Sequence, residues 1–245
     1  IYGKSPAEFS IANRLLQPKT LNDLAVGLQK PIMSDIRLNI TDWEFKTNPK
    51  IDGRELNLNK HDGSRCLAIS PDSKAFLIGG YWHLYLFDWK GERKWSVPIP
   101  GMASAVNISG NGKLALAALG DGTIRWYRMA DGKELLAFFP HKDKKRWVLW
   151  TPSGYYDCSE GAEELIGWHV NQGMDKEAAF YPVARFFEQF YRPELITEVA
   201  RSVDTDKTVL ARLGEKERVN METALKLPPR LSFISPKSGE VLDRE

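Results

Sequence analysis

Hydrophobic residues alternate with polar ones in short runs through the middle of the chain, and each run ends at a turn-forming cluster. The run at 66–69 is followed by Ser-Pro-Asp-Ser, and the run at 105–108 is followed by Ser-Gly-Asn-Gly 39 residues later. Downstream, 84–88 corresponds to 124–128 at an offset of 40 residues, and each is followed by a glycine turn. Such runs predict antiparallel strands joined as meanders. Their period predicts a repeat fold.

The flanking regions show helical spacing instead. Apolar residues in 6–16 and 20–28 recur at intervals of three and four, which predicts two short helices. A Phe-rich stretch at 176–191 predicts an amphipathic helix that ends before Pro193. Further helices are expected at about 194–202, 205–213 and 215–225.

The fold class predicted from these patterns is mainly β with a helical C-terminal connector. The blades are expected as antiparallel meanders, accompanied by short helices. The expected divisions are a helical N-terminal segment at 1–30, β-propeller blades at 31–173, a helical connector at 174–226, and a Pro-Pro linker with the start of a further β module at 227–245. Within the blades, the repeats cover about 64–101 and 102–141, and a shortened capping unit covers 145–170.

One part of the second repeat resembles a known signature. Gly-Asp-Gly-Thr-Ile-Arg-Trp-Tyr at 120–127, followed by Asp-Gly-Lys-Glu-Leu at 131–135, looks like the WD-repeat motif of β-propellers. The resemblance implies partial or degenerate blades held by a hydrogen-bonded set of side chains. The residues matched to that set are Asp121 in the turn, Trp126 and Tyr127 on the third strand, and His61 and His141 before the first strands. The unit from 102 to 139 lacks such a histidine, so its set is expected to be incomplete.

A narrower resemblance covers about 64–240. The stretches 146–157, 165–171 and 190–194 look like the junction in bacterial proteins that join WD-type repeats to a caspase-like peptidase domain. The resemblance implies that this chain holds the last blades and the connector, and stops before a catalytic domain. Because the first residue is Ile1 and not Met, a segment of a longer polypeptide is expected.

Composition narrows the function classes. The 245 residues are 42% hydrophobic and 11% aromatic, which is enough apolar material for a buried core. Basic and acidic residues number 34 and 32 without a basic block, so nucleic-acid binding is not expected. No apolar run approaches the roughly 20 residues of a membrane span, so no membrane partner is expected either. Two cysteines favour a reducing compartment, and a cytoplasmic location is expected.

Candidate chemistry is sparse. Cys66 and Cys158 lack a peptidase motif and are interpreted as packing or surface residues. The four histidines lack metal-ligand spacing, and the glycines belong to strand turns, so no metal, cofactor or catalytic residue is assigned. The alternative from another class is a hydrolase on the propeller face. Its residues would be Asp157, Glu163, Glu164 and His169.

Protein binding is the preferred function. Seven of the eight tryptophans lie within 82–168 and are expected mainly between blades. The candidate partner-binding residues are Arg125, Arg128 and Arg146 on the blades and Phe186 and Phe190 on the Phe-rich helix, which otherwise packs on the propeller. The chain is therefore predicted to be a non-catalytic interaction and regulatory segment. Its partner would be a protein or an adjacent peptidase domain, and another chain would supply missing blades. A protease substrate or released fragment, cut near 201–220, is a further alternative.

Overall fold

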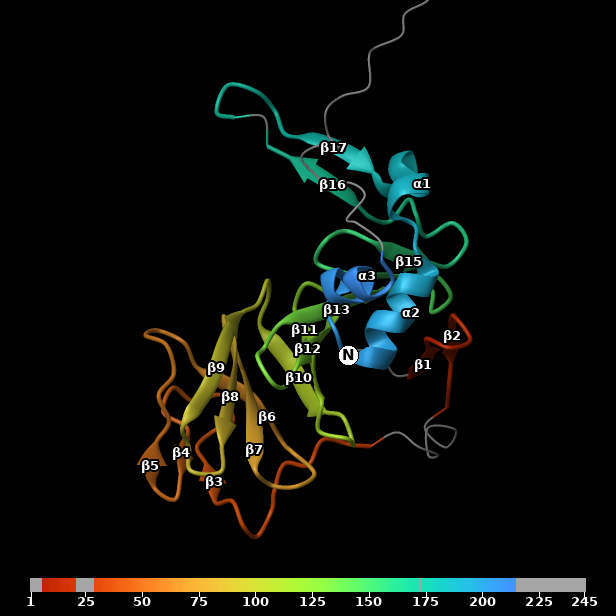
Figure 1. The fold of residues 1–245 in the computed structure, drawn as a ribbon. Coiled ribbons are helices and arrows are strands. Elements are labelled where there is room, and N and C mark those ends of the chain that lie inside the picture. Colours follow the sequence, from red (N-terminus) through yellow and green to blue (C-terminus); the bar gives the residue numbers. More distant parts are fainter. Residues whose placement is uncertain (1–5, 21–28, 172, 215–245) are drawn as a thin grey trace, which may run out of the picture.

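The computed structural model describes residues 6–20, 29–171 and 173–214, and antiparallel β sheet dominates them (Figure 1). Five sheets account for the strands in this part of the chain. Helix among the described residues is confined to one 3-10 turn and three short α-helices, all after residue 182. The predicted fold class, mainly β with short helices at the C-terminal side, is therefore confirmed.

The first repeat forms a four-stranded meander in which each strand pairs with the next along the chain. Its strands are β6 (Ser64–Ile69), β7 (Ala75–Gly80), β8 (His83–Asp88) and β9 (Arg93–Pro98). β7 and β8 are buried along nearly their whole length, whereas β9 at the outer edge is largely exposed. A strand with one solvated face would alternate between buried and exposed positions, so both faces of this sheet are covered.

The second repeat forms a similar meander that then continues beyond its fourth strand. Its strands are β10 (Ala103–Ile108), β11 (Leu114–Leu119), β12 (Ile124–Arg128), β13 (Glu134–Pro140), β14 (Trp147–Trp150) and β15 (Tyr156–Cys158), in that order across one sheet. In the turn between β13 and β14, Asp143 accepts hydrogen bonds from the backbone N–H groups of Lys145 and Arg146. That turn folds β14 directly back onto β13.

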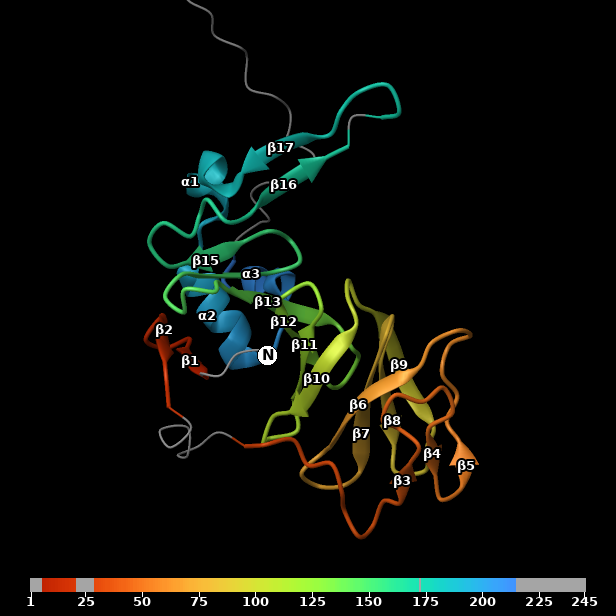
Figure 2. The same cartoon turned by 180° about the vertical axis from the view of Figure 1, so that it is seen from behind.

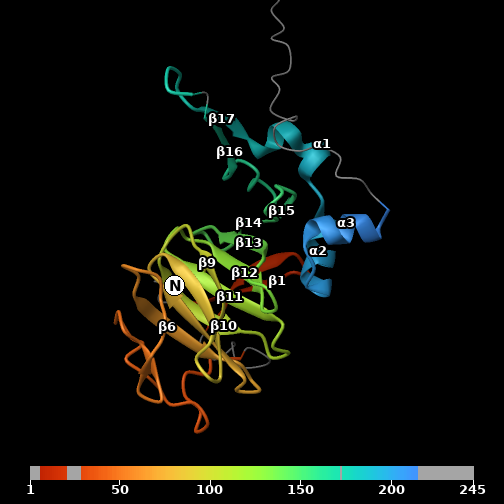
Figure 3. The ribbon, with the colours of Figure 1, turned by 60° about the vertical axis from the view of Figure 1, so that its left-hand side comes forward.

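The capping unit expected at 145–170 is therefore wrong as a separate unit. Its first two strands extend the second sheet, and its last strand, β16 (Gly167–Val170), pairs only with β17 (Ala179–Pro182). The β16–β17 hairpin lies beyond β15, on the far side of the second sheet from the first (Figure 3). The physical reason is the tight β13–β14 turn, which leaves no room for a new sheet to start at residue 145.

The two large sheets pack face to face through small side chains. β10 runs beside β6 and β7 (Figure 2). Gly79 on β7 marks the closest approach, because an added Cβ there would lie 2.6 Å from both the Ala103 Cβ and the Cys66 Sγ atoms. The two meanders thus stack as neighbouring blades of a partial propeller. Buried residues between them include Ala68, Leu77, Leu84, Val106, Ile108, Ala115 and Ala117.

The outer face of the first sheet is covered by residues 38–58, called the covering layer below. The layer contains β3 (Ile40–Thr41), β4 (Lys50–Ile51) and β5 (Arg54–Glu55). Ile51, 1% exposed, packs with Phe76 and Phe87 of the sheet. Glycine is required beneath it at position 91, because the backbone φ there is +81° and a Cβ would lie 2.6 Å from the Ile51 Cγ2 atom.

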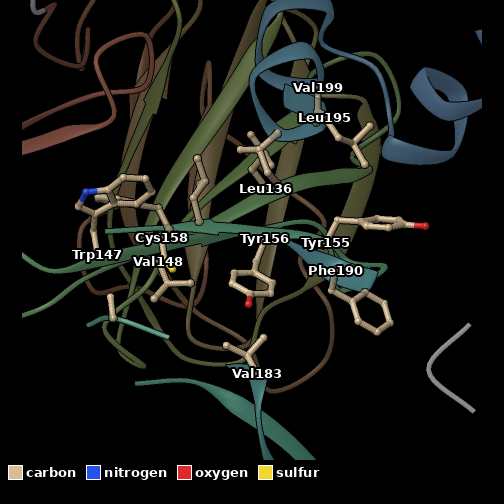
Figure 4. Close-up of a cluster of buried hydrophobic side chains, with 14 of the residues drawn as sticks. Leu136, Trp147, Val148, Tyr155, Tyr156, Cys158, Val183, Phe190, Leu195 and Val199 are labelled. Carbon is tan, nitrogen blue, oxygen red and sulfur yellow. The ribbon is translucent and has the colours of Figure 1, made fainter. Parts of the chain in front are cut away.

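The outer face of the second sheet is covered by the two ends of the described chain. These elements are β1 (Ala7–Ser10), β2 (Leu15–Pro18), α2 (Pro193–Ser202) and α3 (Asp206–Arg212). Leu195 and Val199 of α2 belong to the same buried cluster as Leu136 of β13 (Figure 4). The Phe9 ring of β1 stacks on the Phe138 ring, with centroids 4.2 Å apart.

The helix predicted over 6–16 is wrong, because β1 and β2 form an antiparallel hairpin there. Phe9 faces Leu16 across the hairpin, and both contribute to the cluster beneath it. Arg14 takes a φ of +50° in the turn, where its guanidinium group binds Asp157. Tertiary packing thus overrides local helical spacing. The second predicted helix, at 20–28, lies largely outside the described residues.

The single helix predicted over 176–191 is also wrong. Its first part is strand β17, and only η1 (Val183–Phe186) and α1 (Phe187–Phe190) are helical. Pairing with β16 draws residues 179–182 into extended conformation, and Pro182 then precedes the 3-10 turn. α2 and α3 lie where helices were expected at 194–202 and 205–213. The predictions for 215–225 and 227–245 fall outside the described residues.

The tryptophans are divided between core and surface. Trp147 is fully buried in the second sheet, as expected for a residue that fills the core. Trp82 and Trp89 are 62% and 55% exposed, so these two do not lie between blades, where most of the tryptophans were expected. Both lie in or beside turns that end at the rim of the first sheet, where no neighbouring sheet covers them. The half-buried group consists of Trp95, Trp126, Trp150 and Trp168.

Candidate interaction site

A hollow of about 710 Å³ lies between the second sheet and the β16–β17 hairpin. The second sheet contributes an ion pair from β12 and β13, and the end of β14 with the turn after it contributes Trp150 and Thr151. The hairpin contributes Trp168 and Phe180. The hollow therefore joins residues that lie up to 58 positions apart in the sequence, between Arg125 and Val183. The second sheet and the β16–β17 hairpin thus meet at this hollow.

Aromatic rings form the hairpin side of the hollow. The Trp168 ring is anchored by Phe186 and Phe190, whose ring centroids lie 5.1 and 5.2 Å away. Phe180 is 52% exposed and lies over Gly167, where any Cβ would come within 2.4 Å of the phenyl ring. Position 167 thus needs glycine for close approach. One ring is held rigidly and the other remains accessible, as at surfaces that bind apolar partner groups.

The sheet side of the hollow is charged. The Arg125 guanidinium group lies 3.0 Å from a Glu134 carboxylate oxygen and 3.3 Å from an Asp121 oxygen. Burial raises the pKa of Glu134 above its ordinary value, and the positive charge of Arg125 opposes that rise. Among the lining residues Arg125 and Glu134 balance each other, and Asp121, which lies beside them outside the lining, adds a negative charge. The hollow is therefore suited to a neutral or basic group.

Thr151 adds a buried polar group to the lining. The residue is 1% exposed, and its Oγ1 atom has no hydrogen-bond partner in the part of the chain that the structure describes. A buried hydroxyl without a partner is costly, by about 1–3 kcal/mol. Such a group is a typical feature of a site that a ligand completes.

Two of the predicted partner-binding residues are wrong. Phe186 and Phe190 are 8% and 0% exposed and belong to the core beneath the hollow. The helical spacing that singled them out reflects packing against Trp168 and Tyr155 and not an outward face. They cannot contact a partner directly.

The predicted arginines are all engaged within the chain. Arg125 lines the hollow, as described above. Arg128 pairs with Asp131 at 2.6 Å and reaches Asp204, between α2 and α3, at 3.6 Å. Arg146 pairs with Asp143 at 2.7 Å in the β13–β14 turn. Arg128 thus attaches the α2–α3 region to the second sheet.

The residues matched to the WD signature do not form one hydrogen-bonded set. Asp121 lies in the β11–β12 turn and binds Thr123 and Arg125, whereas the buried Tyr127 hydroxyl has no partner among the described residues. His141 pairs with Asp143 at 2.9 Å, inside its own turn. Trp126 is half-buried on β12 and packs toward the core beside the helices.

His61 is exposed at a φ of +65°, and the neighbouring residue Asp62 carries the buried network instead. Asp62 Oδ2 lies 2.7 Å from the Tyr85 hydroxyl and 3.0 Å from His83 Nδ1. Asp62 Oδ1 accepts the backbone N–H groups of Gly63, Tyr81 and Trp82. The sequence signal was present in the alternation of His83 and Tyr85, which places both side chains on one face of β8.

The alternative hydrolase residues are not gathered at one point. Asp157 is 2% exposed, and both its carboxylate oxygens accept from Arg14, at 2.9 and 2.6 Å. His169 is exposed on β16, where its ring lies 5.7 Å from that of Phe180. Glu163 and Glu164 lie between β15 and β16, partly and fully exposed. The structure thus gives the carboxylate and the imidazole different partners on different sheets.

Both thiols are held in apolar surroundings. Burial raises the pKa of Cys66 and of Cys158 to about 12, so both stay protonated near neutral pH. Within residues 6–20, 29–171 and 173–214, no group of three or more His, Cys, Asp or Glu side chains is placed to hold a metal ion. In the same residues, no helix has the length and apolar character needed to cross a membrane.

Comparison with known proteins gives similarities of structure but none of sequence. No protein-family model and no curated protein matches the chain. Among solved structures, the crystal structure of BamB from Moraxella catarrhalis is similar over 53% of this chain, with 16% sequence identity and a TM-score of 0.35. The similar region is 47% of the BamB chain, so this chain spans about half the length of the structure it matches.

Proposed function

We propose that this chain is a non-catalytic protein-interaction segment whose hollow binds a short stretch of a partner polypeptide. The observation that carries the proposal is the lining itself. It combines an accessible Phe180, an anchored Trp168 and the buried, unpartnered Thr151 hydroxyl, opposite the Arg125–Glu134 pair. Aromatic anchors beside a few fixed polar groups are typical of peptide-binding surfaces.

The charge of the hollow narrows the partner's chemistry. Asp121 and Glu134 exceed Arg125 by one negative charge. An apolar side chain with a neighbouring Lys or Arg would fill the aromatic side and neutralise the acidic side at once. A backbone N–H or a side-chain amide of the partner would donate the hydrogen bond that the Thr151 Oγ1 atom lacks.

We further propose that the segment serves a bacterial caspase-like peptidase system, as the resemblance of 146–157, 165–171 and 190–194 implies. The support in the fold is the way the connector is attached. Arg14 joins Asp157 of β15 to the Tyr191 hydroxyl at 2.6 Å, and the Arg192 N–H donates to the Tyr156 carbonyl at 2.9 Å. These contacts fix the direction in which the chain leaves the blades, which would set the orientation of an adjacent peptidase domain.

Site-specific photo-crosslinking tests the proposal. A photoreactive phenylalanine analogue is placed at Phe180, and the same analogue at Phe187 provides the control, because that residue is 49% exposed but does not line the hollow. The full protein is expressed in its native cells and irradiated. We expect the analogue at position 180 to form a discrete adduct with a partner polypeptide, and the analogue at position 187 to form none. Without crosslinking, Phe180→Ser should prevent that partner from co-purifying.

The two parts of the proposal fail separately. Equal adducts at both positions, or none at 180, would contradict binding in the hollow. An adduct at 180 with a polypeptide other than a caspase-like peptidase would leave the interaction standing and contradict the peptidase system.

A further inference from the structure

An arginine lies among exposed aromatic side chains at one end of the blades, remote in sequence from the hollow. Arg65 is the second residue of β6, and Tyr81 and Trp82 form the turn between β7 and β8. Met102 precedes β10, and Phe45 comes from the covering layer. These five residues are called the arginine cluster below. They share no member with the lining of the hollow.

The rings hold the guanidinium group in place. The Arg65 Cζ atom lies 5.2 Å from the Phe45 ring centroid and 5.0 Å from that of Tyr81, and one terminal nitrogen contacts the Met102 sulfur. Cation–π contacts of this kind fix a cation without neutralising it. The apolar members remain open to solvent, since Phe45, Tyr81 and Met102 are 60%, 38% and 44% exposed.

The charge of Arg65 is not balanced within the described residues. Other arginines, such as Arg14, Arg125 and Arg128, pair with carboxylates. Arg65 forms no ion pair among residues 6–20, 29–171 and 173–214, and its buried Nε atom has no acceptor there. A cation without a carboxylate partner favours an incoming carboxylate, which can accept charge-assisted hydrogen bonds from the terminal guanidinium nitrogens.

The backbone beneath the cluster is fixed before any partner arrives. The Tyr81 and Trp82 N–H groups donate to Asp62 Oδ1 at 2.9 and 3.2 Å. Gly63 lies under the Tyr81 ring, where an added Cβ would be 3.3 Å from a ring carbon. Binding would therefore lose little conformational entropy in this turn.

We propose that the arginine cluster is a second docking surface, which binds an Asp or Glu side chain of a partner polypeptide through Arg65. An apolar residue next to that carboxylate would pack on Phe45 and Tyr81, the latter adjacent to Trp82 in the same turn. This surface selects acidic partners, whereas the hollow has an excess of negative charge. The proposal stands whether or not the hollow binds a peptide.

Two blocked tripeptides test the surface on the purified, ¹⁵N-labelled protein: acetyl-Leu-Glu-Leu-amide and its Gln counterpart. The reporter is the indole N–H resonance of Trp82, assigned through its loss in Trp82→Phe. We expect a saturable shift with the Glu peptide and binding weaker by about tenfold with the Gln peptide, the size of one charge-assisted hydrogen bond. Added salt should weaken the binding of the Glu peptide only, because salt screens the attraction between its carboxylate and Arg65.

Variants assign the effect to Arg65. Arg65→Met should remove the preference for Glu, and Arg65→Lys should retain part of it, which keeps the test valid if the Met variant fails to fold. Arg93→Met is the matched control, because Arg93 donates to Asn57 and Asn59 at the exposed edge of the same sheet. Phe180→Ser should leave the response unchanged. Equal binding of the two peptides, no shift at Trp82, or a Glu preference that survives in Arg65→Met would overturn the proposal.

Discussion

Asp62 connects the stability of the first blade to the geometry of its exposed turn. Its carboxylate accepts from two side chains and three backbone N–H groups while 4% exposed. Burial raises the pKa of Asp62, but the hydrogen bonds, first among them that from Tyr85, outweigh burial and leave the pKa below its ordinary value of 3.8. An ionised carboxylate is therefore part of the folded structure.

The pH dependence of stability follows from that direction. A lowered folded-state pKa contributes stability that is present above the unfolded pKa and is lost as pH falls through the folded value. Asp62→Asn should therefore reduce the free energy of unfolding by about 2 kcal/mol near neutral pH, since several donors lose a charged acceptor.

The difference between wild type and Asp62→Asn should shrink as pH falls below 3.8, because only the wild type loses the contribution there. Urea unfolding across that range measures it. Tyr85→Phe, which removes one donor and keeps the carboxylate, should retain a pH-dependent difference from Asp62→Asn. A difference between wild type and Asp62→Asn that stays constant with pH would contradict this role.

The WD resemblance assigned the structural role to His61, which is the neighbour of Asp62 in the sequence. The reason is that the WD template counts back from the first strand to a histidine. The structure turns His61 outward at a positive φ and places Asp62 inside. Spacing alone could not distinguish adjacent residues, since the distinction depends on which side chain the turn directs toward His83 and Tyr85.

At the scale of elements, the connector shows how a correct hydrophobic pattern gives a wrong secondary structure. Phe186 and Phe190 have helical spacing and do lie in η1 and α1. Phe180 shares the pattern but belongs to β17, because β16 offers a partner strand. The sequence identified which residues are apolar, but pairing between residues 167–170 and 179–182 decided where helix begins. The site was missed for the same reason, since Phe180 and Trp168 meet only through that pairing.

The stability of the connector should depend on the buried side of α1, which carries Phe190, and not on its exposed side, which carries Phe187. Phe190 is fully buried against Tyr155, Trp168 and Phe186. Phe190→Ala should lower the free energy of unfolding by about 3–5 kcal/mol through the lost burial and the cavity left behind. Phe187, three residues earlier, is 49% exposed, and its ring stacks on that of Tyr191. Phe187→Ala should therefore lower the free energy of unfolding by only about 1 kcal/mol.

Chemical denaturation of both variants checks this difference. Similar losses in the free energy of unfolding for Phe190→Ala and Phe187→Ala would show that α1 does not pack as described.

At the scale of the whole molecule, the two stacked sheets are enclosed by their own chain. The covering layer buries the outer face of the first sheet, and β1, α2 and α3 bury that of the second. The repeats were predictable because their turns recur at a fixed period. Their enclosure was not, because residues 38–58 form strands of only two residues each and carry little periodic signal. Blades from another chain, expected from the length, are not needed to cover these two faces.

A charge placed in the covering layer tests this enclosure. Ile51→Asp should lower the free energy of unfolding by about 4 kcal/mol and expose the face that contains Phe76 and Phe87, because an unpaired carboxylate cannot be buried there. Ile36→Asp is the matched control: Ile36 is 104% exposed, and its replacement should change stability by about 0.5 kcal/mol or less. Dye binding to apolar surface and thermal unfolding measure both. Equal effects would mean that the layer does not close the sheet.

The unequal edges of the two sheets affect how the molecule resists aggregation. In the second sheet β14 covers β13, whereas β9 is a free edge strand among the described residues and could add a strand from another copy. β9 begins with Arg93 and Lys94, which are exposed, and ends with Pro98, which has no N–H to donate. Repulsion between like charges and the missing donor both oppose fibril-like growth at this edge. The charged start of β9 thus acts as a safeguard for solubility at an outer blade edge that the chain leaves open in its described part.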